Sequence, residues 1–258
     1  EMPALSFTYL RILLAMVVFF MVSGRAQGLL LPRPLWPSLL RAGLAQTMFQ
    51  LLLIAGRQRT TAGNGAILLA TAPLLTAGWL AITGRERLDG RQWSGLVLGF
   101  IGVGFVVQSS GVRVTWSQLG GDLLALCAAG AWAWYSLVIG PLVGTLGTVR
   151  ATGWTMVVAA LCCTPLALVE VRDYTWRSVS WGAWTGLVYG ATIGMVMAMA
   201  LWGRSMQRLG PKQTMIYVYL EPVSAVVIAA AVLGESLRPS QAVGALLTFV
   251  GVALGSSH

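Results

Sequence analysis

The chain has 258 residues, of which 57% are hydrophobic and 10% are charged, whereas an ordinary soluble domain carries about 25% charged residues. This composition excludes a soluble globular protein and predicts an all-α membrane protein whose surroundings are the lipid bilayer. The net charge of +9 does not indicate nucleic acid as a partner, because the basic residues lie mostly at the ends of apolar stretches, where they face anionic headgroups.

Nine apolar stretches follow one another with short connections, and most are long enough to cross a hydrocarbon core of about 30 Å. In chain order they cover residues 5–22, 37–56, 62–82, 93–107, 121–139, 151–169, 181–202, 213–233 and 241–255. The three cysteines, at 127, 162 and 163, lie inside these stretches, which argues against a disulfide framework or a zinc site.

The basic residues divide unevenly between the two sides of the predicted membrane, ten against six. The richer side holds Arg25, Arg33, Arg41, Arg85, Arg87, Arg91, Arg150, Arg204, Arg208 and Lys212, and the other holds Arg57, Arg59, Arg113, Arg172, Arg177 and Arg238. Since cytoplasmic loops are enriched in Lys and Arg, we expect an integral membrane protein with a cytoplasmic C-terminus.

An internal repeat appears at a constant offset of 149 residues. Eight identities align without a gap: Arg59, Pro73, Glu86, Leu88, Gln92, Gly95, Gly102 and Val103 match Arg208, Pro222, Glu235, Leu237, Gln241, Gly244, Gly251 and Val252. An odd number of spans separates the copies, so they have opposite orientations in the membrane. Inverted repeats of this kind are typical of secondary transporters, whose substrate site lies near the midplane.

On these residues the sequence resembles the drug/metabolite transporter superfamily, in its EamA-type branch of ten-helix bacterial carriers. Both copies match that pattern: a helix with a proline (Ala72-Pro73 and Glu221-Pro222), a Gly/Glu turn and a glycine-rich closing helix. The resemblance implies two EamA repeats, over residues 1–108 and 109–258. Family members have five helices per half and this sequence shows four in its first half, so we expect the chain to begin at the family's second helix.

One carboxylate, Glu221, falls well inside a span, where a lone charge is costly unless it is paired or hydrated. Helical spacing places Thr214, Tyr217, Glu221 and Ser224 on one stripe. The stripe is the wall of a cavity that binds an ammonium group or a proton, or else Glu221 is neutralised against another helix. The sequence leaves both interpretations open.

Other polar and aromatic residues inside spans complete the candidate substrate-binding set: Arg11, Gln46, Gln50, Asn64, Trp132 and Tyr135. Arg11 either extends to the membrane surface or pairs with Glu221. The amides of Gln46, Gln50 and Asn64 line the cavity or hold helices together. The aromatic rings suit an amphipathic solute, although packing is the commoner role of such rings.

A secondary transporter fits this pattern best, and the resemblance implies an exporter of amino acids or other small metabolites in a bacterial inner membrane. An intramembrane enzyme is the rival class, but no nucleophile elbow, zinc-protease motif or phosphate-binding loop occurs in the sequence. A non-transporting helix bundle is the third class, and the inverted repeat argues against it. We expect no catalytic residue, metal or cofactor; the partners are a small-molecule substrate and lipid, and the protein is a monomer or a homodimer.

Overall fold

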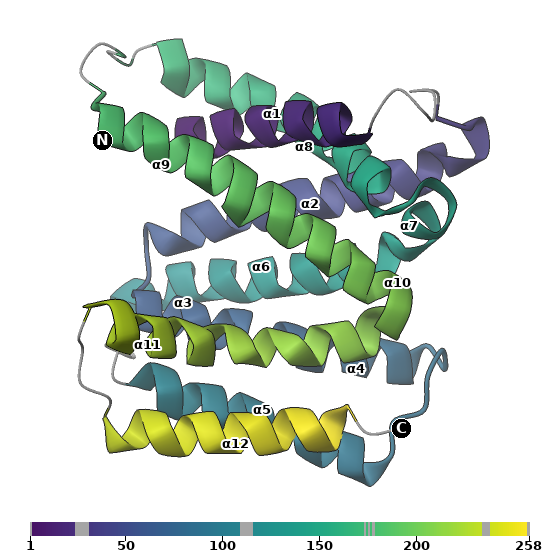
Figure 1. Cartoon of the computed structure of the whole chain (residues 1–258), viewed down its shortest axis with the longest axis vertical. Helices are drawn as coiled ribbons and strands as arrows, with labels where there is room; N and C mark the ends of the chain where they lie inside the picture. The colour runs from purple at the N-terminus through teal and green to yellow at the C-terminus, as the bar shows by residue number, and fades with distance from the viewer. Residues whose placement is uncertain are drawn as a thin grey trace. The chain divides into compact units, whose positions relative to one another are not determined.

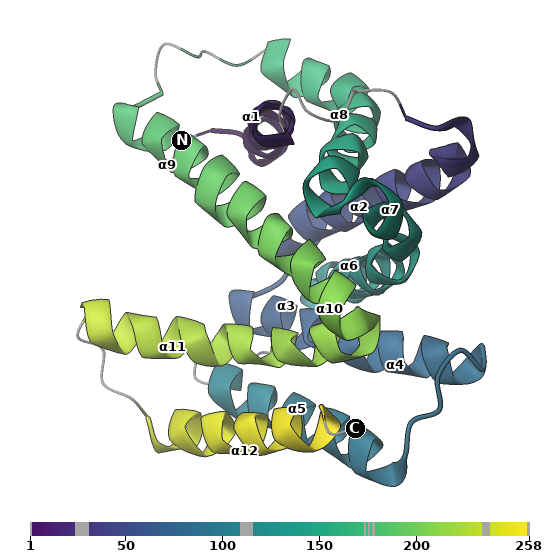
Figure 2. The same cartoon turned by 45° about the vertical axis from the view of Figure 1, so that its right-hand side comes forward.

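The computed structural model describes residues 2–23, 31–108, 116–172, 174, 176, 179–233 and 238–256. Over these ranges the chain is built from helices, and no strand occurs in them (Figure 1; Figure 2). Away from its ends, a helix pairs its backbone N–H and C=O groups within the segment, which a chain surrounded by hydrocarbon requires. The predicted all-α membrane fold is therefore confirmed.

The described ranges contain twelve α-helices and four short 3-10 or π segments. The elements are α1 (Ala4–Ser23), η1 (Arg33–Leu35), α2 (Trp36–Arg57), α3 (Ala62–Leu69), α4 (Ala72–Ile82), α5 (Gly90–Val107), η3 (Trp116–Gln118), α6 (Leu119–Val138), α7 (Gly140–Leu146), α8 (Thr148–Arg172), α9 (Trp181–Ala191), η5 (Thr192–Met197), α10 (Ala198–Ile216), η6 (Tyr217–Tyr219), α11 (Leu220–Leu233) and α12 (Pro239–Gly255).

Every predicted span lies on helix, but several ends differ from the hydropathy pattern. The span predicted at 62–82 is divided into α3 and α4 two residues before Pro73. The helix predicted to end at Trp202 continues to Gly210, whose φ of 76° ends the regular helix before Pro211. Hydropathy marks the part of a helix that suits lipid, and polar residues such as Arg204 extend a helix beyond it without a change of backbone.

The chain forms two compact units that do not follow the order of the sequence. The first unit contains Glu1–Ile54 and Trp134–Gly210, and the second contains Ala55–Ala133 and Pro211–His258. The divisions fall inside α2, α6 and α10, so each of these helices contributes residues to both units.

In the first unit α1 packs along α8. The carboxylate of Glu170, near the end of α8, accepts hydrogen bonds from the backbone N–H and the hydroxyl of Ser6, at 2.6 and 2.7 Å. The hydroxyl groups of Tyr9 and Thr164 are 3.1 Å apart farther along the same pair. Because Glu170 accepts a backbone N–H that the first turn of α1 leaves unpaired, it fixes the start of α1 against α8.

In the second unit α5 and α12 lie side by side in both views (Figure 1; Figure 2) and cross with their backbones almost in contact. A Cβ atom added to Gly95 would lie 2.7 Å from the carbonyl oxygen of Gly251, and one added to Gly251 would lie 2.8 Å from the carbonyl oxygen of Gly95. Gly102 and Gly244 have the same reciprocal relation, at 2.8 and 2.7 Å. Small residues allow this approach, and any side chain would prevent it.

These contacts have the pattern that an inverted repeat requires. Gly95 and Gly244 are repeat equivalents, as are Gly102 and Gly251, so each contact maps onto the other when the two copies are exchanged. Residues early in α5 meet residues late in α12, which makes the pair antiparallel, and α4 and α11 also run in opposite directions (Figure 1). The inverted orientation is therefore confirmed for these helices. The repeated turn at 234–237 lies outside the described residues.

Candidate functional site

The second unit contains a break in the helix that carries the predicted stripe. Tyr217–Tyr219 form a 3-10 turn between α10 and α11, and Glu221-Pro222 follow in the first turn of α11. Pro222 has no N–H to donate into a continuous α-helix, which accounts for the tighter turn before it. The carboxylate of Glu221 therefore lies beside an irregular stretch of backbone inside an apolar segment.

Because the 3-10 turn interrupts the α-helical spacing, the four residues of the predicted stripe do not all share one face. Tyr217 is 44% exposed, and Glu221 and Ser224 are also exposed, whereas Thr214 is 2% exposed. The Thr214 hydroxyl has no hydrogen-bond partner among the described residues. Three residues of the predicted stripe thus have accessible side chains, and the fourth presents an unsatisfied hydroxyl to the packed interior. Their role toward a substrate stays a prediction.

Arg57, at the end of α2, is near enough to Glu221 in this unit to interact with it electrostatically. The sequence had offered Arg11 as a partner for Glu221, whereas Arg57 was expected only among the basic residues at span ends. A basic residue at a helix end gives no sequence signal of which acidic residue lies near it in the fold. Arg11 belongs to the first unit.

Asn64 is tied to a carboxylate that the sequence analysis did not single out. Its side-chain nitrogen donates to both oxygens of Asp122, at 3.1 and 3.2 Å, and the Thr60 hydroxyl donates to the same carboxylate. Asp122 lies in the first turn of α6, where a negative charge is favourable. Asn64 thus connects α3 with α6, one of the two roles that the sequence left open, and Trp132 is half-buried farther along α6.

In the first unit the structure brings Arg11 and Gln50 together. A guanidinium nitrogen of Arg11, on α1, donates to the side-chain oxygen of Gln50, on α2, at 3.3 Å. A Cβ atom added to Gly190 would lie 3.7 Å from Cδ of Arg11, so the backbone of α9 lies next to the arginine side chain. Arg11 is therefore held among three helices rather than extended away from the protein.

Gln46 precedes Gln50 by one turn of α2 and is 1% exposed. Its side-chain oxygen has no hydrogen-bond partner in the described part of the chain. Tyr135 is fully buried beside Thr152 and Thr155 of α8, and its role toward a substrate stays a prediction. The predicted cavity combines residues of both units, so it stays a prediction.

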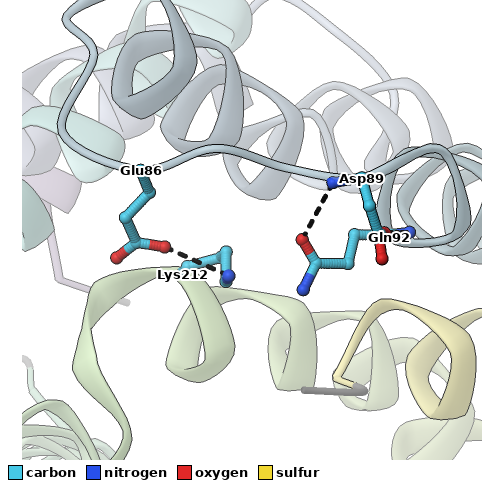
Figure 3. A network of polar contacts seen from close by, with 4 residues as sticks. All are labelled: Glu86, Asp89, Gln92 and Lys212. Carbon is cyan, nitrogen blue, oxygen red and sulfur yellow. Dashed lines mark hydrogen bonds and ion pairs between the residues drawn. The ribbon is translucent and has the colours of Figure 1, made fainter.

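A second polar group lies near the start of α5 (Figure 3). Glu86 and Lys212 form an ion pair of 3.2 Å, with both side chains partly exposed. Asp89 caps α5, because its carboxylate accepts from the N–H of Gln92 at 2.7 Å while Gln92 accepts from the N–H of Asp89 at 3.3 Å. Gln241, the repeat equivalent of Gln92, accepts from a backbone N–H at the start of α12 at 2.9 Å. The repeated glutamines thus cap the helices that follow the two turns.

Among the described residues, no group of three His, Cys, Asp or Glu side chains is placed to hold a metal ion.

Comparison with known proteins gives consistent matches over almost the whole chain. The profile of the EamA-like transporter family matches residues 1–108 and 119–257. A Bacillus subtilis protein named uncharacterized transporter YyaM is 27% identical over 81% of this chain and 68% of its own length. A Streptantibioticus cattleyicolor protein named as a probable terminal-alkyne amino-acid exporter is 26% identical over 80% of this chain and 68% of its own length.

A solved crystal structure superposes with a TM-score of 0.81 at 19% identity, covering 99% of this chain and 89% of that one. At this identity the similarity supports the helical fold and not a substrate.

Proposed function

The chain belongs to the EamA-like transporter family of membrane proteins, and from this premise we propose that it exports neutral amino acids, aromatic ones among them. Its similarity to a protein named as a probable amino-acid exporter supports this substrate class. Transport proceeds by alternating access, in which the inverted repeats exchange conformations around a central substrate site. The C-terminus is on the cytoplasmic side, as the distribution of basic residues favours.

Glu221 is the observation that carries the proposal. It is a carboxylate in an apolar segment, it is exposed, and it lies beside a 3-10 turn and a proline. Ionisable residues within spans are costly and mark substrate or proton pathways. Discontinuous helices at such positions form the substrate and ion sites of many transporters. In this proposal Glu221 binds a cation during each cycle, either the substrate's ammonium group or a coupling proton.

The test is the flux of labelled amino acids through proteoliposomes with Glu221→Gln, which keeps the shape of the side chain and removes its charge. A hydrogen bond to a charged group contributes about 1.5–3 kcal/mol, so we expect flux to fall by about ten- to a hundredfold. Glu86→Gln is the matched control, because Glu86 pairs with Lys212 outside the predicted spans. Flux through this variant should equal that of the wild type. Full flux through Glu221→Gln would reduce Glu221 to a packing residue.

A further inference from the structure

The first unit holds three polar residues that the proposed function has not used: Arg11 and Gln50, which are hydrogen bonded, and Gln46, which lies one helical turn before Gln50; these three are called the polar cluster. Arg11 is the eighth residue of α1, about 10 Å along the helix from its start. Gln50 is 4% exposed and Gln46 is 1% exposed, so both amides are buried within the unit. Buried amides and an intramembrane arginine are costly unless they are paired, and ionisable residues within spans often mark functional sites.

Arg11 offers hydrogen-bond donors, whereas the Gln46 side-chain oxygen offers a hydrogen-bond acceptor. Arg11 presents a planar guanidinium with five N–H donors, and its contact with the Gln50 oxygen, at 3.3 Å, orients that plane. A guanidinium binds a carboxylate through two parallel hydrogen bonds. Gln46 provides a buried oxygen acceptor without a partner among the described residues, and it is a helical neighbour of Gln50, with Cβ atoms about 5–6 Å apart.

We propose that Arg11, Gln46 and Gln50 recognise the head group of an α-amino acid: Arg11 binds the carboxylate, Gln46 accepts a hydrogen bond from the amino group, and Gln50 positions Arg11. The substrate class rests on the proposed function. An α-amino acid matches the polar cluster because one carbon atom carries both a carboxylate, which accepts from Arg11, and an amino group, which donates to Gln46. With the amino group held at Gln46, the cation left for Glu221 is a coupling proton.

Gly190 contributes the space beside this cluster. An added Cβ atom would be in ordinary contact with Arg11, at 3.7 Å, and with Phe7, at 3.9 Å. A larger side chain at this position would therefore press on the Arg11 side chain and displace it from Gln50. The absence of a side chain at Gly190 thus lets the Arg11 guanidinium stay beside Gln50, where we propose that the head group binds.

The experiment uses three matched probes with one side chain: phenylalanine, phenethylamine, which lacks the carboxylate, and 3-phenylpropionate, which lacks the amino group. Each is titrated against the purified full chain in a thermal-shift binding assay and is also used to compete with labelled phenylalanine uptake in proteoliposomes. We expect the wild type to bind phenylalanine about ten- to a hundredfold more tightly than either analogue, as the loss of a charged hydrogen bond implies.

Each variant removes one preference and leaves the other. Arg11→Gln should bind phenylalanine and phenethylamine equally while it still disfavours 3-phenylpropionate. Gln46→Met should bind phenylalanine and 3-phenylpropionate equally while it still disfavours phenethylamine. Gln50→Met should weaken only the preference against phenethylamine, because it acts through Arg11. Thr47→Val is the control, since the Thr47 hydroxyl donates to the carbonyl of Gly43 at 2.8 Å within α2, and both preferences should remain.

The inference is overturned if the wild type binds phenylalanine no better than its analogues, or if folded Arg11→Gln keeps the preference against phenethylamine. A protein that binds phenylalanine with the expected preferences but moves none across liposomes would uphold the recognition site and reject the proposed export. Loss of folding in Arg11→Gln is checked with Arg11→Lys, which keeps a cation but not the bidentate geometry and should retain part of the preference.

Discussion

A methyl group at Gly95 should separate the two helices whose contact defines the inverted repeat. In Gly95→Ala the new Cβ atom would lie 2.3 Å from the backbone nitrogen of Gly255, whereas ordinary contacts begin at 3.4 Å. Because the obstacle is backbone, no rotamer change relieves it, and α5 and α12 must move apart by about 1 Å.

Overpacking of this kind costs about 1–3 kcal/mol, and for a chain of this size each kcal/mol lowers the midpoint of thermal unfolding by about 2–4 °C. We therefore expect Gly95→Ala to unfold about 2–12 °C lower than the wild type in the same detergent. Gly244→Ala, its repeat equivalent, should behave alike, because its Cβ atom would lie 2.6 Å from the nitrogen of Val106.

Gly104 supplies the control on the same helix, since nothing lies within 4 Å of a Cβ atom added there. Gly104→Ala should be neutral or stabilising by about 0.5–1 kcal/mol, the usual advantage of alanine over glycine in a helix. Thermal unfolding followed by intrinsic tryptophan fluorescence measures all three variants. If Gly95→Ala and Gly104→Ala unfold at the same temperature, the close crossing of α5 and α12 is not present in the folded protein.

Two further variants test polar contacts of the second unit by the same unfolding assay. Asp122→Leu should destabilise the protein by about 1–3 kcal/mol, because it leaves the buried amide of Asn64 without its acceptor; an unchanged midpoint would mean that water replaces the carboxylate. Lys212→Gln should cost at most about 1 kcal/mol, since its ion pair with Glu86 is partly exposed, and 1 M salt should remove the difference; a larger or salt-independent loss would show that Lys212 has another role.

The fold could be predicted largely from the sequence because hydrophobic length and the repeat offset are strong signals in a membrane protein. The repeat aligns Gly95 with Gly244 and Gly102 with Gly251, and the structure adds that Gly95 and Gly251 meet each other across the repeat. The exact ends of the helices could not be predicted as well. Polar residues after Trp202 do not stop a helix, and the turn at Tyr217–Tyr219 follows from Pro222 and its packing rather than from hydropathy.

The sequence could predict the candidate site only as a set of polar and charged residues in unusual positions inside spans. Charge and polarity inside spans identified Glu221, Arg11 and Gln50, and the contact between the last two lies within the first unit. The sequence could not show that Asn64 is bound to Asp122, because that pair joins residues 58 positions apart. Partners brought together by tertiary packing leave no trace in local periodicity.

The most direct test of the transport claim is the efflux of labelled neutral amino acids from proteoliposomes that contain the wild-type chain, compared with protein-free liposomes of the same lipid. The account predicts saturable efflux of at least one neutral amino acid, with competition by unlabelled phenylalanine. Efflux equal to that of protein-free liposomes for every amino acid tested, from a chain shown to be folded and inserted, would contradict it.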